Sequence, residues 1–469
     1  MPGQADRRCF GDMTRVMKET VRIASGQGFW GDLLNAPLDQ VRKGPVDYLV
    51  MDYLAEVTMS ILQKQKRNDP ALGYAKDLVP LMQELLPFVL DRGVRVITNG
   101  GGVNPVACRD AIFAAARKAG LKGLRIGVVL GDDILSRIDD LGAHNIPLRN
   151  METGEELASV RNSLLSANVY FGAGPIAEAL RLGAQIVITG RTTDTGLTLA
   201  PMMHEFGWAA DDWNRIAAGT IAGHILECGA QASGGNFSAD WRSVLDLAHV
   251  GFPIAEASPS GDIVITKHPG TGGLVSVQTV KEQLLYEIGD PSRYITPDCI
   301  ADFTSVRLQP DGPNRVRMTG VRGNAPTDSY KVSMSHLDGY SAFGSLTYSW
   351  PEALEKAEAA DRIVRTRLAD LGLVLDEVRT EFLGYNACHG PLAPKPETVN
   401  EVVLRVGVRS KDYTAVERFG KEIAPLVLTG PPGVTGFAGG RPKPSEVVAY
   451  WPALIPKSAV TPAVIVEEL

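Results

Sequence analysis

Short apolar runs alternate with longer helical stretches up to residue 190, and this alternation limits the folds open to the chain. The runs are rich in Val and Ile and lack strict polar alternation, which is typical of strands buried on both faces. Helices are expected between them, for example at 78–93 and 105–121. The pattern predicts an α/β fold with a doubly wound, mostly parallel sheet in the N-terminal half. The predicted strands are VRIAS (21–25), VDYLVMD (46–52), VRVITN (94–99), LRIGVVLGD (124–132) and AQIVITG (184–190).

The pattern changes after about residue 245. A hairpin is expected around Asp311-Gly312, because such a pair between two apolar runs favours a tight turn. Further on, strand and helix signals follow the order β-α-β-β-α-β, with helices at 351–372 and near 414–428. This order is typical of the ferredoxin-like split motif. We therefore expect two domains: an α/β domain at 19–330 with glycine-rich ligand-site loops, and an α+β ferredoxin-like domain at 331–469.

Composition excludes several classes of partner. The 469 residues carry a net charge of −7, which gives no electrostatic case for binding nucleic acid or an anionic membrane. No apolar stretch is long enough to span a membrane, and residues 1–18 resemble a frayed leader without the apolar segment of a secretory signal. The five cysteines are scattered without a C-x-x-C pair, which argues against disulfides and structural zinc. A cytoplasmic protein is expected.

A glycine-rich loop follows the first predicted strand in the stretch VRIASGQGFWGD. Gly26, Gly28 and Gly31 form a G-x-G-x-x-G, which raises the question of a dinucleotide site. Asp32 opposes that reading because it would lie beside the pyrophosphate, and Pro37 would interrupt the helix that should follow. We interpret the loop as one wall of an anion or acyl site, with a purely structural turn as the alternative, and assign no cofactor.

Polar residues also follow the other predicted strands, where the carboxyl ends of parallel strands form the ligand edge of a sheet. For Arg191 we favour binding of a substrate carboxylate or phosphate through its planar fork, with an ion pair to Asp194 as the structural alternative. Asp52 and Glu56 are candidate acid–base groups. The alternative is structural: Asp52 would lie at a solvated strand end, and Glu56 would cap the helix that follows. The candidates at this edge are Asp52, Glu56, Asn99, Gly101, Asn104, Arg191, Thr192 and Asp194.

Two later segments add reactive side chains. In GHILECG, His224, Glu227 and Cys228 share one face of a helix, where His and Glu suit proton transfer and Cys228 is a minor nucleophile candidate. A half-buried helix face with one satisfied histidine is the alternative, and no complete set of metal ligands is visible. Asn236, Lys267 and His268 lie in glycine-rich segments suited to an anion or a thioester oxygen, although ordinary turns fit them nearly as well.

Several blocks together resemble the acyclic terpene utilisation AtuA family. They include ASGQGFWGD, DYLVMDYLAE, TNGGGVNP, VITGRTTDTGL, AGHILECGAQASGGNF, KHPGTGGLVSVQTVKEQLLYEIGDP and TGPPGVTGFAGGRP, and with the remaining blocks they run from about 21 to 456. The resemblance implies a soluble cytoplasmic protein associated with the breakdown of branched or terpenoid acyl-CoA compounds. It does not imply a settled reaction.

The residues favour a lyase of the hydratase or dehydratase type acting on a branched acyl or carboxylic substrate. Acids, a histidine and an arginine lie at strand ends, whereas the G-x-S-x-G of serine hydrolases and a redox motif are missing. The alternatives are a non-catalytic acyl- or CoA-binding subunit and a hydrolase. We also expect a homo-oligomer, because the stretch VVAYWPALIP (447–456) carries Tyr450 and Trp451, and aromatic residues are enriched at interfaces. A strand in the protein core is an equal alternative for this stretch.

Overall fold

The computed structural model describes residues 18–436 and 439–469, so most of the expected leader (1–18) lies outside the described residues. The chain divides into two compact units. The first holds the residues up to Ser159, Ser166–Met334 and Pro452–Leu469, and the second holds Val160–Leu165 and Ser335–Trp451. The C-terminal residues from Pro452 on therefore belong to the first unit, whereas the sequence placed them in the second domain.

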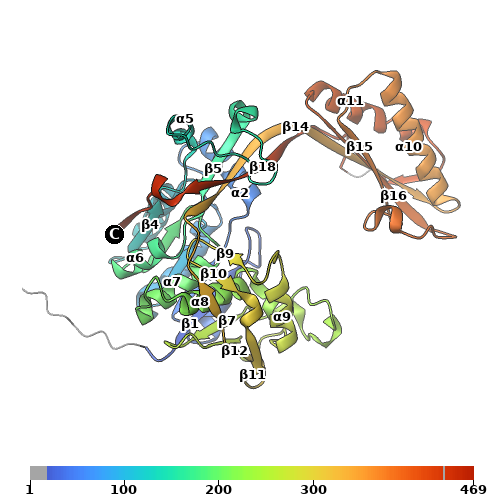
Figure 1. Cartoon of the computed structure of the whole chain (residues 1–469). Coiled ribbons are helices and arrows are strands. Elements are labelled where there is room, and N and C mark those ends of the chain that lie inside the picture. The colour runs from blue at the N-terminus through green and yellow to red at the C-terminus, as the bar shows by residue number, and fades with distance from the viewer. Residues whose placement is uncertain (1–17, 437–438) are drawn as a thin grey trace, which may run out of the picture. The chain divides into compact units, whose positions relative to one another are not determined.

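A ten-stranded mixed sheet forms the centre of the first unit (Figure 1), in the order β11-β12-β8-β7-β1-β2-β3-β6-β4-β19. Its middle strands β1, β2, β3, β6 and β4 are mutually parallel. The flanking strands pair antiparallel, so the sheet is mixed rather than mostly parallel. The bounds are β1 Val21–Gln27, β2 Tyr48–Met51, β3 Arg95–Thr98, β4 Arg125–Leu130, β6 Ile186–Thr189, β7 Ile254–Ala257, β8 Ile263–Thr266, β11 Arg307–Pro310, β12 Arg315–Thr319 and β19 Ala463–Glu468.

Helices pack on both faces of this sheet. Alternate residues of β2 show why: Tyr48 and Val50 belong to one buried hydrophobic cluster, and Leu49 and Met51 belong to another. The first cluster takes in α6, α7 and α8, and the second takes in α1, α3 and α4. The helix bounds are α1 Ala36–Lys43, α2 Glu56–Asn68, α3 Leu78–Arg92, α4 Pro105–Lys118, α5 Ile138–Ala143, α6 Gly174–Arg181, α7 Gly196–Phe206, α8 Trp213–Glu227 and α9 Val277–Leu285.

The predicted hairpin at Asp311-Gly312 is confirmed, because β11 and β12 pair antiparallel on either side of it. A small sheet of three strands, in the order β13-β10-β9, lies in the same unit. Its strands are β9 Tyr294–Ile295, β10 Ile300–Asp302 and β13 Arg322–Asn324, and β10 and β13 contact α8. The small sheet therefore packs against α8.

The second unit is a sheet with helices, in the strand order β15-β16-β14-β17, with β18 also paired to β14. Its core is formed by alternate residues of β16, such as Val402, Leu404 and Val406, together with apolar residues of the two longer helices. Trp451 is buried here, 2% exposed, and its ring lies 6.2 Å from that of His336. The elements are β14 Ser329–Ser349, α10 Ala353–Asp370, β15 Glu377–Leu383, β16 Glu401–Ser410, α11 Tyr413–Ile423, α12 Leu426–Thr429, β17 Val434–Gly436 and β18 Ser445–Pro456.

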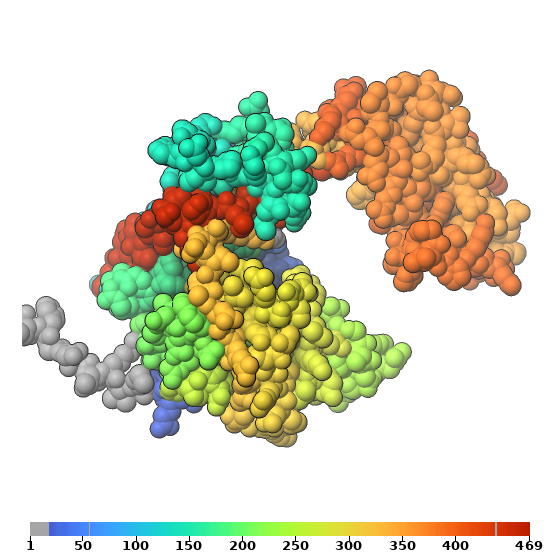
Figure 2. Space-filling view, in the orientation of Figure 1, coloured from blue at the N-terminus to red at the C-terminus, as the bar shows by residue number. Residues whose placement is uncertain are grey.

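The last strand of the described chain closes one edge of the large sheet. β19 pairs antiparallel with β4 along its whole length, from Ala463 opposite Leu130 to Glu468 opposite Arg125. Just before it, the end of β18 contacts the segment near residue 150, where Met151 N donates to Pro452 O at 2.9 Å, and Figure 2 shows the red C-terminal chain lying against this teal segment. Among the described helices, none combines the length and the apolar character needed to cross a bilayer.

Candidate functional site

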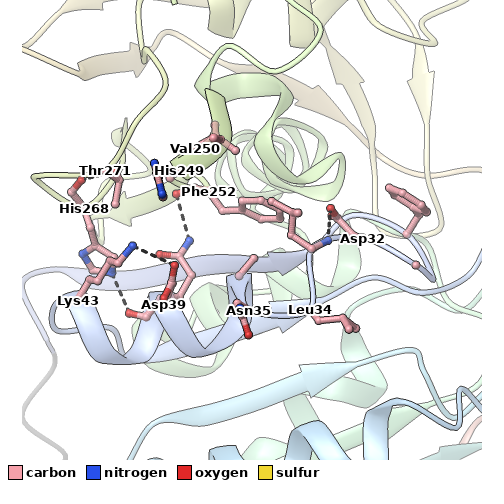
Figure 3. Close-up of a pocket in the computed structure, with 17 residues that line it drawn as sticks. Asp32, Leu34, Asn35, Asp39, Lys43, His249, Val250, Phe252, His268 and Thr271 are labelled. Carbon is pink, nitrogen blue, oxygen red and sulfur yellow. Dashed lines mark hydrogen bonds and ion pairs between the residues drawn. The ribbon is translucent and has the colours of Figure 1, made fainter. Parts of the chain in front are cut away.

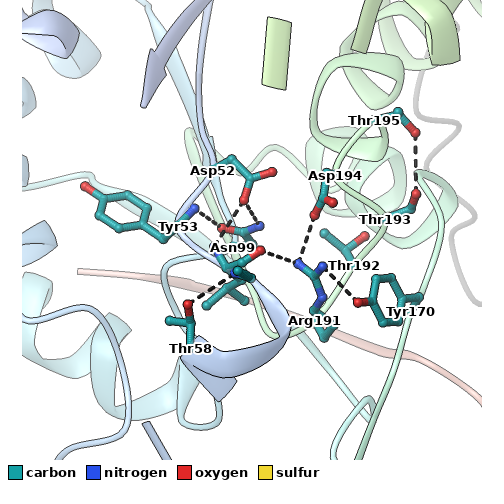
Figure 4. A network of polar contacts seen from close by, with 12 residues as sticks. Asp52, Tyr53, Thr58, Asn99, Tyr170, Arg191, Thr192, Thr193, Asp194 and Thr195 are labelled. Carbon is teal, nitrogen blue, oxygen red and sulfur yellow. Dashed lines mark hydrogen bonds and ion pairs between the residues drawn. The ribbon is translucent and has the colours of Figure 1, made fainter. Parts of the chain in front are cut away.

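The carboxyl ends of β2 and β3 bring Asp52 and Asn99 together (Figure 4). Asn99 Nδ2 donates to Asp52 Oδ1 at 2.6 Å, and Leu54 N donates to the same oxygen at 3.1 Å. Tyr53 N in turn donates to Asn99 Oδ1 at 2.7 Å, which fixes the amide's orientation. Asn99 is fully buried, so its hydrogen bond holds Asp52 in place from the interior of the protein.

Arg191 follows β6 and is also buried, at 2% exposure. Its Nη1 donates to Leu54 O at 2.7 Å and to Asp194 Oδ1 at 2.8 Å, and its Nη2 donates to Tyr170 Oη at 3.0 Å (Figure 4). The guanidinium therefore binds protein groups on both sides of its fork. This arrangement fits the structural alternative, in which Arg191 orients Asp194, better than a fork presented to a substrate.

His224 and Glu227 form a hydrogen-bonded pair at the end of α8. His224 Nε2 lies 2.9 Å from Gln283 O, and a carbonyl oxygen only accepts, so Nε2 carries a proton. His224 Nδ1 lies 2.7 Å from Glu227 Oε1, so the two groups share one further proton. Phe303 packs against the imidazole at 5.3 Å between ring centroids and shields it from solvent.

These groups border a cavity of about 610 Å³, which we call the acidic cavity. Five of its lining residues carry carboxyl groups, whereas Arg191 is its one lining arginine and is already paired. Such a charge disfavours a carboxylate or phosphate as the occupant. The lining residues are Gly28, Phe29, Asp32, Asp52, Leu54, Ala55, Arg191, Asp194, Glu227, Cys228, Ala230, Gln231, Gly235, Asn236, Tyr286 and Glu287.

Two of these carboxyl groups hold protons more tightly than usual. Burial raises the pKa of Asp52 well above its ordinary value, and Asp194 adds to the rise, against the opposing effects of Arg191 and Asn99. Burial also raises the pKa of Glu227. Burial alone would lower the pKa of His224, but the charge and hydrogen bond of Glu227 outweigh it and the net shift is upward. The pair therefore keeps its shared proton to a higher pH than an isolated imidazole would.

Glu227 has an oxygen left over for a ligand. Its Oε1 faces His224, while its Oε2 is buried and has no hydrogen-bond partner among the residues the structure describes. A buried carboxyl oxygen without a partner is costly, and a bound water or hydroxyl group would satisfy it. Glu227 therefore lines the acidic cavity while one of its carboxyl oxygens, buried in the wall, has no hydrogen-bond partner among the described residues.

Cys228 lines the same cavity, but its environment does not suit a nucleophile. Burial and then the charge of Glu227 raise the pKa of its thiol to about 12. A thiol attacks as the thiolate, which this environment suppresses.

The glycine loop after β1 packs against the end of α8. A Cβ atom at Gly28 would lie 2.6 Å from Gly229 N, so only glycine fits there. The backbone N of Gly28 donates to Asp32 Oδ2 at 2.8 Å, and a carboxylate thus occupies the donor that a pyrophosphate would need. Gly26 packs inside the sheet, where a Cβ would lie 2.9 Å from Leu49 Cδ1.

Of the predicted site residues, Gly28, Asp52, Arg191, Asp194, Glu227 and Asn236 line the acidic cavity, with Asn99 and His224 directly behind its wall. The other predicted residues lie elsewhere, and several have structural contacts. Asn104 Nδ2 donates to Leu72 O at 2.7 Å, Thr192 Oγ1 donates to Phe171 O at 2.8 Å, and a Cβ at Gly101 would lie 2.6 Å from Thr189 O. Glu56 begins α2, and its side chain lies outside what the structure describes.

Lys267 and His268 follow β8 and line two neighbouring cavities instead. Lys267 Nζ donates to Thr271 O at 2.7 Å, and His268 Nε2 donates to Gln40 O at 2.8 Å.

Sequence reasoning missed Tyr286 and Glu287. They follow α9, and Glu287 has a φ of 58°, a left-handed conformation uncommon outside glycine. The segment LLYEIGDP carries no spacing signal that places it near the strand ends, because its position depends on how α9 packs against α8.

Among the described residues, no three His, Cys, Asp or Glu side chains gather in a way that could hold a metal ion.

A family model for the acyclic terpene utilisation family protein AtuA matches residues 21–466. No curated protein shows significant similarity to the chain.

Proposed function

The chain belongs to the AtuA family of acyclic terpene utilisation proteins, and from that premise we propose that it adds water to, or removes water from, a branched acyl substrate. Membership implies involvement in acyclic terpene utilisation. The reaction class rests on the acidic cavity, in which Asp52 and Glu227 provide the acid and the base.

One observation carries the proposal: two buried carboxyl groups on separate elements face one cavity in different environments. Asp52 follows β2 and holds its proton because of burial. Glu227 ends α8, is hydrogen-bonded to His224, lines the same cavity and keeps one oxygen, Oε2, without a partner among the described residues. Pairs of carboxyl groups in unlike environments are how proteins run acid and base steps together.

Hydration then proceeds with balanced atoms. Protonated Asp52 donates its proton to one carbon of the substrate's double bond. A water held at Glu227 Oε2 attacks the other carbon and gives its proton to Glu227, while His224 stabilises the carboxylate before the transfer. The net change is the addition of one water, and solvent exchange returns the proton to Asp52. Dehydration is the same path in reverse.

The charge of the acidic cavity supports an uncharged reacting group. Carboxylates around an alkene or alcohol favour the positive charge that develops on carbon during protonation. A free carboxylate bound there would instead be repelled by Asp32, Asp194 and Glu287.

The test is a water-addition assay on purified protein with branched acyl substrates whose alkyl-substituted double bond or tertiary hydroxyl group is not conjugated with the carbonyl, as thioesters and as free acids. Loss of the alkene proton signal in NMR and incorporation of labelled oxygen from water report turnover. Asp52→Asn removes the acid with little change in shape, and general acid–base catalysis typically contributes about 10²–10⁴-fold, so the rate should fall by at least about 100-fold.

The matched control is Glu84→Gln on α3, because Glu84 is exposed and lines none of the three cavities described here. It should retain full activity. Activity of the unmodified protein should also decline as pH rises through the raised pKa of Asp52, since the acid is active only when protonated. Absence of water addition or loss with every substrate would reject the enzyme and favour a non-catalytic acyl-binding subunit.

A further inference from the structure

Three cavities of the first unit adjoin one another through shared walls. Phe29 and Asp32 line both the acidic cavity and a second cavity of about 640 Å³, which we call the loop cavity. His268 and Thr271 line both the loop cavity and a third cavity of about 450 Å³, which we call the cationic cavity. The three cavities therefore lie next to one another in the order acidic, loop and cationic.

The loop cavity is lined by one ion pair, Asp39 with Lys43, and by one further carboxyl group, that of Asp32 (Figure 3). Lys43 Nζ is paired with Asp39 Oδ2 at 2.9 Å, and burial keeps His268 neutral by lowering its pKa. Phe29, Leu33 and Leu34 line it and remain 59%, 52% and 67% exposed. Exposed apolar side chains beside a cavity suit an uncharged chain that would cover them.

The cationic cavity has the opposite charge to the acidic one. Arg22, Lys267 and Arg315 line it, and Glu256 is its single acidic residue among the described lining residues. Glu256 contacts both arginines, with Arg315 Nη2 at 2.7 Å from Oε2, and Arg315 also lies 3.5 Å from Asp311. Positive charge is in excess at this cavity even after these pairs are counted.

Lys267 strengthens the case for an anion at this cavity. Its side chain is 7% exposed, yet its Nζ donates only to uncharged atoms of Thr271, and it has no carboxylate partner among the described residues. Burying an ammonium group without an opposite charge is unfavourable, and a bound anion would relieve that cost.

We propose that the three cavities form one extended site for a ligand with an uncharged reacting end and a phosphate-bearing end, with the phosphates held at Arg22, Lys267 and Arg315. This inference rests on the proposed function for the reacting end. Two sources share this chemistry: an acyl thioester of coenzyme A and a terpenoid diphosphate.

The experiment measures binding of coenzyme A and of geranyl diphosphate by calorimetry, with geraniol as an uncharged, phosphate-free probe. Arg315→Gln removes one positive charge of the cationic cavity. Because a charge-assisted hydrogen bond contributes about tenfold or more in affinity, the phosphate probe that binds should bind about tenfold more weakly to this variant. Binding of that phosphate probe to the unmodified protein should also weaken as salt is added, and geraniol should bind both proteins equally.

Arg317→Gln is the matched control, because Arg317 lies on the same strand, pairs with the same Asp311, and does not line the cavity. Thermal melting of both variants checks that they fold. The inference is overturned if neither phosphate probe binds, or if the two variants bind them equally. Phosphate binding without water addition rejects the proposed function alone, whereas turnover of free acids without phosphate binding rejects this inference alone.

Discussion

At the scale of single residues, the side chains predicted from the sequence fall into two groups. Some line the acidic cavity, and others form hydrogen bonds to the side chains that line it. Asp52 and Glu227 face it, while Asn99 and His224 support them from behind. Arg191 borders the cavity but binds Leu54, Tyr170 and Asp194.

Arg191→Ala should lower the free energy of unfolding by about 3 kcal/mol, because the change breaks a buried ion pair with Asp194 and removes the hydrogen bonds to Leu54 O and Tyr170 Oη. Arg191→Lys keeps the charge but loses the planar fork, so it should be intermediate. Chemical denaturation measures both. Arg181→Ala, at an exposed ion pair with Glu178, is the control and should leave stability unchanged. If Arg191→Ala is as stable as the unmodified protein, the structural role is wrong and Arg191 is again a candidate for binding the substrate.

Glu227→Gln should lower the pKa of His224. Burial disfavours the imidazolium, and in the unmodified protein the carboxylate outweighs that effect. Without the carboxylate, burial acts alone and the ring loses its second proton at a lower pH. Nitrogen-detected NMR of labelled histidine follows the titration of His224 in the unmodified protein and in the variant. An unchanged His224 titration would mean that the pair does not share a proton.

At the scale of elements, the carboxyl ends of the parallel strands determine where polar groups meet. Asp132, after β4, illustrates this: it is 4% exposed, and its Oδ2 accepts from Arg191 N at 2.8 Å and from Asn168 Nδ2 at 2.9 Å. Burial raises its pKa to about 6. It thereby links the end of β4 to the turn after β6.

Asp132 should make stability depend on pH. Its pKa is higher in the folded chain than in the unfolded chain, so its contribution is fully present below the unfolded value near 3.8 and is lost as pH rises through about 6. The shift of about two pH units corresponds to about 3 kcal/mol. The free energy of unfolding, measured from pH 4 to 7 for the unmodified protein and for Asp132→Asn, should show the difference shrinking by about that amount as pH rises. A constant difference would contradict the assignment.

The same strand ends explain what the sequence could predict. Apolar runs locate β1 to β4 and β6, so the meeting of Asp52, Asn99 and Asp194 follows from parallel pairing. Tyr286 and Glu287 were missed as lining residues because their places depend on the packing of α9 and on a left-handed turn at Glu287. The split β-α-β description of the second unit remains a prediction, although its strands and helices occur in the expected order.

At the scale of the whole molecule, the structure leaves only one of the two aromatic residues that supported the expected homo-oligomer on the surface. Trp451 lies in a core, so only Tyr450, 37% exposed, remains as a surface aromatic in that stretch. The prediction is a particle mass in solution that is a multiple of 50.3 kDa, measured by light scattering. A mass of 50.3 kDa would contradict it.

The pairing of β19 with β4 also sets an order of events during synthesis. β4 emerges from the ribosome early, whereas its partner emerges only after the entire second unit. Until then the buried apolar strand β4 is the edge of the large sheet, and exposed edges of this kind are where nascent chains associate wrongly. The first unit is therefore complete only when its last strand has been made and has taken over that edge.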